Sequence, residues 1–234
     1  MSDSAGERDA EAAAVADDPL RVEIWSDVVC PWCYIGKRRF ETALDRFTAE
    51  TGTEVEIVYR PFMLDPTAPA EPQPVTEVYA KKFGQAADQI LERVTSEAAG
   101  EGIEFRMDIA KRANTLSAHR LLVLAEREGV QGPLKERLMQ AYFTEGTDIN
   151  DGETLVALAG EVGLDAETVR AWLAGDGGRA EVADSLEFAA ANGLGSVPTY
   201  VFDRRLAVPG AQDPDTFLLV MERVASTDGP VQFD

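Results

Sequence analysis

The spacing of apolar residues predicts two strands with a helix between them at the start of the chain. Leu20–Trp25 alternates moderately and Glu54–Arg60 alternates strictly, so both are expected to be strands. Between them, apolar residues at helical spacing predict a helix from near Cys30 to about Thr51, and Gly52 supplies its end. A strand, a helix and a second strand in so short a stretch favour a right-handed βαβ unit with parallel strands.

The pattern becomes helical after Pro61. Several prolines mark an irregular connection up to about residue 74. Helical spacing then predicts a series of helices over Val75–Ala99, Asn114–Glu128, Pro133–Thr144, Glu153–Val162, Ala166–Ala174 and Arg179–Asn192. Asn114, Asp151 and Asp165 stand where N-caps are expected.

Strand patterns return after Gly193. Thr199–Asp203 and Leu206–Val208 flank Arg204-Arg205, which predicts a tight hairpin, and Asp213 or Asp215 then opens a last helix. The order βαβ, helices, ββα indicates an α/β protein. We expect residues 20–61 and 193–234 to form one domain and residues 62–192 an all-helical insertion. The last helix of the insertion, at about 179–192, is a candidate to pack on the first domain.

Charge limits the classes of partner. The chain has 42 acidic and 22 basic residues, a net charge of −20. This acidity argues against nucleic-acid binding through phosphates. Arginine is far commoner than lysine, which together with the acidity favours a halophilic protein, soluble in concentrated salt; an acidic protein of an ordinary cytoplasm is the alternative.

The N-terminal residues 1–19 predict a disordered acidic tail. They carry six acids and one base, without the basic start and apolar core of a signal peptide. No apolar run approaches the roughly 18 residues of a transmembrane helix. We therefore expect a cytoplasmic protein without a membrane partner.

The two cysteines of the chain, Cys30 and Cys33, form a C-x-x-C motif where the first strand meets the first helix. So short a loop adds little stability as a disulfide. A zinc site needs about four ligands, and His119 is the one histidine of the chain, so we expect no metal. The spacing therefore favours reversible disulfide chemistry.

The position of each cysteine predicts its role. Cys30 is expected to be exposed at the start of the helix, where unpaired amides and the helix dipole lower a cysteine pKa from about 8.5 toward roughly 3.5–7.5. It would then be the attacking thiol, and Cys33, one turn later, the shielded resolving thiol. Pro31 suits the first helical turn, and Trp32 offers an apolar surface to a substrate. Asp27 is a candidate either for relaying a proton to Cys33 or for binding loop amides.

Four motifs together resemble the DsbA-like branch of the thioredoxin superfamily. They are Asp27-x-x-Cys30-Pro31-Trp32-Cys33, Asn114-Thr115-x-x-Ala118-His119-Arg120, Val197-Pro198-Thr199-Tyr200-Val201-Phe202 and Gly210-Ala211-Gln212. More narrowly, they resemble cytoplasmic FrnE-type proteins, which are related to 2-hydroxychromene-2-carboxylate isomerases and kappa-class glutathione transferases. One departure is Ser196, where the family often has glycine. The resemblance implies a thioredoxin-like fold (βαβ … ββα) interrupted by a large helical insertion.

The resemblance also extends the predicted site. It implies that Pro198 is a catalytic residue in a cis-proline loop beside the cysteines; without the resemblance, an ordinary trans proline at the start of a strand is the alternative. Val197 and Thr199 would contact substrate, as would Pro31 and Trp32.

The Val197 backbone would pair with an extended peptide. His119 would face the active site as a further substrate-binding residue; without the resemblance, a lone histidine in an apolar helix is more often a core residue.

The expected function is a thiol–disulfide oxidoreductase, which exchanges disulfides with a protein or small thiol through Cys30 and Cys33. It needs no cofactor beyond its own redox-active disulfide, with glutathione as a candidate co-substrate. The alternatives are a kappa-type glutathione-dependent isomerase or transferase, which typically has serine at the position of Cys30, and a non-catalytic redox sensor or holdase. Family members are often dimeric, so a homodimer is an expectation from the resemblance alone.

Overall fold

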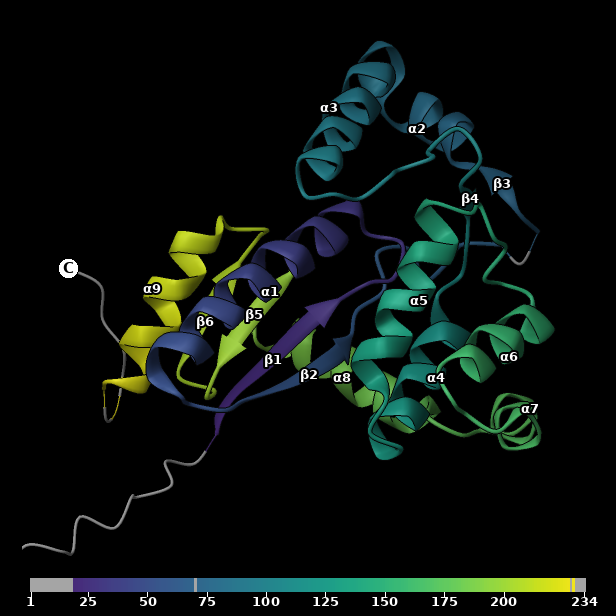
Figure 1. Ribbon diagram of the computed structural model, residues 1–234. Helices are drawn as coiled ribbons and strands as arrows, with labels where there is room; N and C mark the ends of the chain where they lie inside the picture. Colours follow the sequence, from purple (N-terminus) through teal and green to yellow (C-terminus); the bar gives the residue numbers. More distant parts are fainter. Residues whose placement is uncertain (1–18, 70, 228, 230–234) are drawn as a thin grey trace, which may run out of the picture.

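A four-stranded sheet lies at the centre of the computed structural model, which describes residues 19–69, 71–227 and 229 (Figure 1). Its order is β2-β1-β5-β6. The strands are β1 (Leu20–Ser26), β2 (Val55–Pro61), β5 (Thr199–Phe202) and β6 (Leu206–Pro209). β1 is parallel to β2 and antiparallel to β5. The predicted parallel strands are therefore confirmed.

The hairpin between β5 and β6 is present, but its loop has three residues, Asp203 to Arg205, and not the predicted pair Arg204-Arg205, because Phe202 pairs with Leu206. Asp203 and Arg204 have φ angles of 47° and 55°. Both lie in the left-handed region that tight hairpin turns favour. Asp203 also binds back to β1, because its carboxylate accepts a hydrogen bond of 2.9 Å from the amide of Arg21.

Helices cover both faces of the sheet. α1 (Pro31–Thr51) and α9 (Pro214–Ala225) pack side by side on one face (Figure 1). There Phe40 of α1 meets Tyr200 of β5 and Phe217 of α9, with ring centroids 5.2 and 5.3 Å away. α8 (Arg179–Ala191) covers the other face, where Phe188 stacks on Trp25 at 5.3 Å. The last helix of the predicted insertion thus contacts the sheet.

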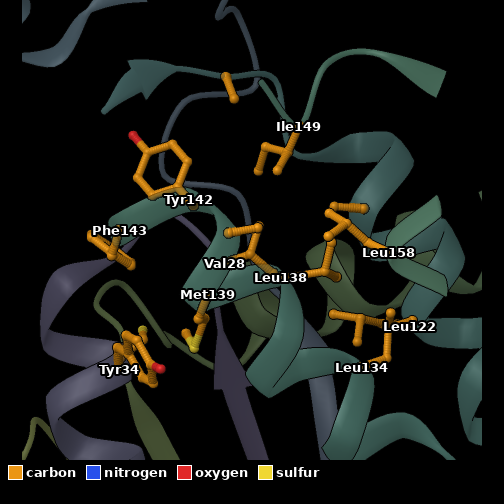
Figure 2. Packing of buried hydrophobic residues seen from close by; sticks show 14 of the residues in the cluster. Val28, Tyr34, Leu122, Leu134, Leu138, Met139, Tyr142, Phe143, Ile149 and Leu158 are labelled. Atoms are coloured by element: carbon orange, nitrogen blue, oxygen red, sulfur yellow. The ribbon is translucent and has the colours of Figure 1, made fainter. Parts of the chain in front are cut away.

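The helices between β2 and α8 in the chain make up a second region, the helical part of the protein. They are α2 (Val75–Phe83), α3 (Ala87–Gly100), α4 (Leu116–Arg127), α5 (Gln131–Phe143), α6 (Gly152–Glu161) and α7 (Ala166–Ala174). Their hydrophobic core is continuous with the start of α1: Val28 and Tyr34 belong to the same cluster as Leu138 and Met139 of α5 (Figure 2). The cysteines therefore lie at the junction of the sheet and the helical part.

Three details of the sequence prediction are wrong. The helix expected over Val75–Ala99 is broken, because Gly84 ends α2 with a φ of 57° and a short 3-10 turn (Gly84–Ala86) leads into α3. The N-cap of α4 is Thr115, and Asn114 instead accepts a hydrogen bond from the Leu116 amide.

The third error concerns the connection expected to be irregular up to residue 74. Its end forms a two-residue strand, β3 (Gln73–Pro74), which pairs with β4 (Lys111–Arg112). The pairing depends on residues far apart in the chain, so no local pattern indicates it.

The fold class is confirmed: an α/β protein with βαβ and ββα segments separated by helices. The N-caps at Asp151 and Asp165 are also confirmed, and Asp213 is the N-cap of α9. None of the helices in the described ranges is both long and apolar enough to cross a membrane.

Gly36 allows α1 to approach β5 and the loop before it. A Cβ atom at this position would lie 2.7 Å from the Tyr200 hydroxyl and 3.2 Å from Cγ of Pro198. The first distance is shorter than a normal contact. The absence of a side chain at Gly36 therefore sets how closely the start of α1 can lie against this loop.

We predict that Gly36→Ala lowers the free energy of unfolding by about 1–3 kcal/mol, the usual cost of overpacking a dense core. Gly160→Ala is the matched control, since Gly160 lies in α6 with nothing within 4 Å of an added Cβ. That control should gain up to about 1 kcal/mol from the removal of a helical glycine. Urea denaturation measures both, and equal stability of the two variants would contradict the tight approach.

Candidate active site

The turn after β1 places the two cysteines at the start of α1. Cys30 is the N-cap residue and Pro31 takes the first helical position. The carbonyl of Cys30 accepts hydrogen bonds from the amides of Cys33 and Tyr34, at 3.0 and 3.3 Å. Both cysteines are free thiols. The first turn of α1 therefore holds the side chains of Cys30 and Cys33 next to each other.

The loop before β5 lies against Cys30. The Cys30 thiol donates to the carbonyl oxygen of Val197, with an S···O distance of 3.7 Å. The peptide bond between Val197 and Pro198 is cis. The hydroxyl of Thr199 donates to the carbonyl of Ser196 at 2.8 Å, so Thr199 holds the loop in shape from within. The structure therefore brings together Cys30 and the three loop residues named from the sequence.

The residues between the cysteines differ in exposure. Pro31 is buried, whereas Trp32 is half-buried. The guanidinium of Arg93, from α3, lies 5.9 Å from the centroid of the Trp32 ring. Trp32 thus borders both the thiols and the helical part, and presents a partly accessible apolar surface beside them.

The expected exposure of Cys30 is wrong. Cys30 and Cys33 are each only 3 % exposed. The loop before β5, which contains Val197 and is called the Val197 loop, covers the sulfur of Cys30 on one side. The core of the helical part packs close to both cysteines. A substrate must therefore approach along the Val197 loop or displace part of this cover.

The expected lowering of the Cys30 pKa is also wrong for the dithiol form. Its hydrogen bond with Cys33, burial and the nearby Cys33 charge raise the pKa of Cys30 well above its usual range. Burial acts to raise the pKa of Cys33 as well, but the hydrogen bond from Cys30 and the positive charge of Lys135 outweigh burial and lower it. Cys33 therefore loses its proton at a lower pH than a free cysteine, and loss of a second proton, from Cys30, is disfavoured.

Asp27 and His119 form a buried, hydrogen-bonded pair close to the cysteines. Nε2 of His119 donates to Oδ1 of Asp27 at 3.1 Å, and both side chains are at most 1 % exposed. The second carboxylate oxygen of Asp27 accepts a hydrogen bond of 2.8 Å from the Leu64 amide. His119 therefore lies buried against Asp27 near the cysteines, and, contrary to expectation, its side chain is not exposed to a substrate. Asp27 binds a loop amide, one of its two expected roles.

The partners of Asp27 determine its charge. Burial acts to raise its pKa, but the hydrogen bond from His119, the amide of Leu64 and the charge of Lys135 outweigh burial and lower the pKa. Asp27 is therefore an ionised carboxylate in the core. Within the described ranges, no group of three or more His, Cys, Asp or Glu side chains is placed to hold a metal ion.

Sequence reasoning missed Lys135. This residue of α5 is 1 % exposed, and its charge acts on both Cys33 and Asp27. The available signal was helical spacing: Lys135 falls on the same stripe as the buried residues Leu138, Met139 and Tyr142. A lysine within an apolar stripe indicates a buried charge.

We predict that Asp27→Asn lowers the free energy of unfolding by about 1–3 kcal/mol at neutral pH, because it removes a buried hydrogen-bonded charge. A carboxyl group with a lowered folded pKa stabilises the fold above its unfolded pKa of about 3.9, and this stabilisation is lost as the pH falls through the folded value. The deficit of the variant should therefore shrink below about pH 4.

Urea denaturation of both proteins over this pH range provides the test. Asp108→Asn is the control, because Asp108 is a surface carboxylate beside Arg106 and should matter little. A deficit that stays constant or grows on acidification would contradict the stabilised carboxylate.

Comparison with known proteins agrees with this geometry. Residues 21–222 match the model of the DsbA-like thioredoxin domain. The uncharacterized protein YwbO of Bacillus subtilis is 28% identical over 199 residues, which cover 85% of this chain and 94% of YwbO. A probable DsbA oxidoreductase from Streptomyces coelicolor is 38% identical, with a TM-score of 0.83 over 92% of this chain and 94% of its own.

More distant solved structures share the fold. The cytosolic disulfide reductase DsbM of Pseudomonas aeruginosa, in a structure with GSH, has a TM-score of 0.62 at 22% identity over 87% of this chain and 98% of its own. A 2-hydroxychromene-2-carboxylate isomerase has a TM-score of 0.59 at 15% identity over 87% of this chain and 95% of its own. The family match spans most of the sequence and includes both cysteines and the Val197–Pro198 loop, and on this basis the chain belongs to the DsbA-like thioredoxin domain family.

Proposed function

We propose that this chain is a thiol–disulfide oxidoreductase, which exchanges disulfides with a protein or a small thiol through Cys30 and Cys33. The observation that carries the proposal is the contact of the Cys30 thiol with the Val197 carbonyl, since a C-x-x-C pair beside this loop is what disulfide exchange with a substrate bound along the loop would need. Membership of a family of oxidoreductases supports it.

In the reducing direction, Cys30 is the attacking thiol. Cys33 has the lower pKa of the pair, so transfer of the Cys30 proton to the Cys33 thiolate gives the Cys30 thiolate. This thiolate attacks one sulfur of a substrate disulfide, and the other substrate sulfur leaves with the electron pair. The product is a mixed disulfide between Cys30 and the substrate.

Cys33 completes the exchange. The proton that Cys33 took from Cys30 passes to the substrate thiolate released in the first step, which leaves Cys33 as a thiolate. This thiolate attacks the sulfur of Cys30, the bond from Cys30 to the substrate breaks, and the second substrate sulfur leaves as a thiolate. The protein then holds a disulfide between Cys30 and Cys33. The oxidising direction is the same sequence reversed, in which two substrate thiols are converted to a disulfide and the protein returns to its dithiol form.

The loop before β5 is the proposed binding site for an extended substrate. An extended peptide would run along Val197, in the manner of strand addition, and bring its sulfur to Cys30. The half-buried ring of Trp32 would contact the apolar part of the substrate. Asp27 and His119 lie beneath the cysteines, where they shape the electrostatics of the pair and do not touch the substrate.

Glutathione is the proposed small thiol. A fold relative, the reductase DsbM, is described with GSH, and the resemblance to kappa-class transferases points to the same tripeptide. On this proposal glutathione is a co-substrate that forms a mixed disulfide with Cys30, and it does not act as a resident cofactor.

We predict that the purified protein reduces insulin disulfides or oxidises a dithiol peptide, and that Cys30→Ser abolishes either activity because no attacking sulfur remains. Cys33→Ser is the matched variant: it should still form the mixed disulfide with Cys30 but fail to release it. Mass spectrometry after incubation with oxidised glutathione should therefore find one added glutathione on the Cys33→Ser variant.

Three results would count against the proposal. Absence of turnover in both directions would sink the oxidoreductase function and favour a redox sensor or holdase. Activity that survives Cys30→Ser would show that the attacking thiol is assigned wrongly. Glutathione conjugation or isomerisation without disulfide turnover would support the kappa-type alternative.

A further inference from the structure

Lys135 is a buried cation close to the two cysteines. It lies in α5 between Leu134 and Leu138, both fully buried. Its own side chain is 1 % exposed, and among the described residues its Nζ has no hydrogen-bond partner. An ammonium group held out of water without a hydrogen bond is costly, so it must be compensated by nearby charge.

The surroundings of Lys135 contain that charge. The groups that act on it are Cys33 and Lys37 from α1, Cys30 and Asp27 from the turn before α1, and the Tyr59 ring of β2, whose centroid lies 5.7 Å from Nζ. Asp27 is in turn bound by His119 of α4. The one other cation in this set, Lys37, is paired with Glu41 and Glu136 at 2.5 and 2.7 Å.

We propose that Lys135, supplied by the helical insertion, is the counter-charge for the thiolate form of Cys33 in the step that resolves the mixed disulfide. This inference rests on the proposed disulfide exchange and assigns a further residue to it. Lys135 is a positioning residue, because it acts on the substrate only through the sulfur of Cys33.

The mixed disulfide makes this role specific. In the dithiol form, the Cys30 thiol stabilises the Cys33 thiolate by a hydrogen bond. In the mixed disulfide the Cys30 sulfur is bonded to the substrate and has no proton to donate. Of the groups that favour the Cys33 thiolate, Lys135 is then the one that carries a positive charge; the Ser26 hydroxyl is neutral.

Asp27 strengthens the need for a cation. Its ionised carboxylate acts to raise the pKa of Cys30, so it opposes further negative charge at this end of the thiol pair. Lys135 offsets this charge. Burial lowers the pKa of Lys135 to about 8, although the charges of Cys33, Asp27 and Cys30 act to raise it. At neutral pH the amine therefore remains mostly protonated and provides the counter-charge.

The test measures the pKa of Cys33 in a Cys30→Ala background, in which the Cys30 hydrogen bond is absent as in the mixed disulfide. The ultraviolet absorbance of the thiolate is recorded against pH, with and without Lys135→Met. Loss of one opposite charge should raise the Cys33 pKa by about one pH unit or more. Lys37→Met is the matched control, since Lys37 is a buried lysine whose charge is already paired, and it should shift the pKa much less.

A shift with Lys135→Met no larger than that with Lys37→Met, in variants that unfold as cooperatively as their parent, overturns the proposal. If Lys135→Met does not fold, the unsubstituted protein provides the test. NMR titration of the lysine ε-carbons should then give a lower pKa for Lys135 in the disulfide form than in the dithiol form, because closing the disulfide removes the thiolate.

An unchanged Lys135 pKa between the two forms would equally overturn the proposal. Neither titration needs turnover. A failure of disulfide exchange in the insulin assay is therefore distinguishable from a failure of the Lys135 assignment.

Discussion

The buried carboxylate of Asp27 is the constraint on which the rest of the site depends. A charge with no access to water must be bound from several sides, and its partners come from separate parts of the chain: His119 from α4, the amide of Leu64 and the charge of Lys135 from α5. These contacts fix the turn that carries Cys30. The helices between β2 and α8 are therefore part of the candidate active site, since they supply the side chains that hold and balance this charge.

A second constraint on the candidate site is the close approach of α1 to the loop before β5. Gly36 permits this approach and the Val197 carbonyl meets the Cys30 thiol. The thiols consequently lie between the buried pair of Asp27 and His119 and the loop before β5. The hydrogen bond with Cys33 and burial together raise the pKa of Cys30.

Local sequence patterns were sufficient for most strands and helices, but not for the break at Gly84 or the pairing of β3 with β4. The alternation of Glu54–Arg60 and the N-caps at Asp151 and Asp165 depend on neighbouring residues, and all are present in the structure. The hairpin between β5 and β6 is likewise local. The motifs also located the two cysteines and the Val197–Pro198 loop. Properties that depend on distant residues were missed. The burial of Cys30 depends on Val197, more than 100 positions away, and Lys135 is buried in the core that α5 shares with the cysteines.

The central claim is that Cys30 and Cys33 form one reversible redox pair open to external thiols. The most direct measurement equilibrates the protein in buffers of varied ratio of reduced to oxidised glutathione, then counts free thiols by alkylation and mass spectrometry. The account predicts a single two-electron transition between the dithiol and an intramolecular disulfide between Cys30 and Cys33. Cysteines that stay reduced at every ratio, or that carry glutathione without closing the disulfide between them, would contradict it.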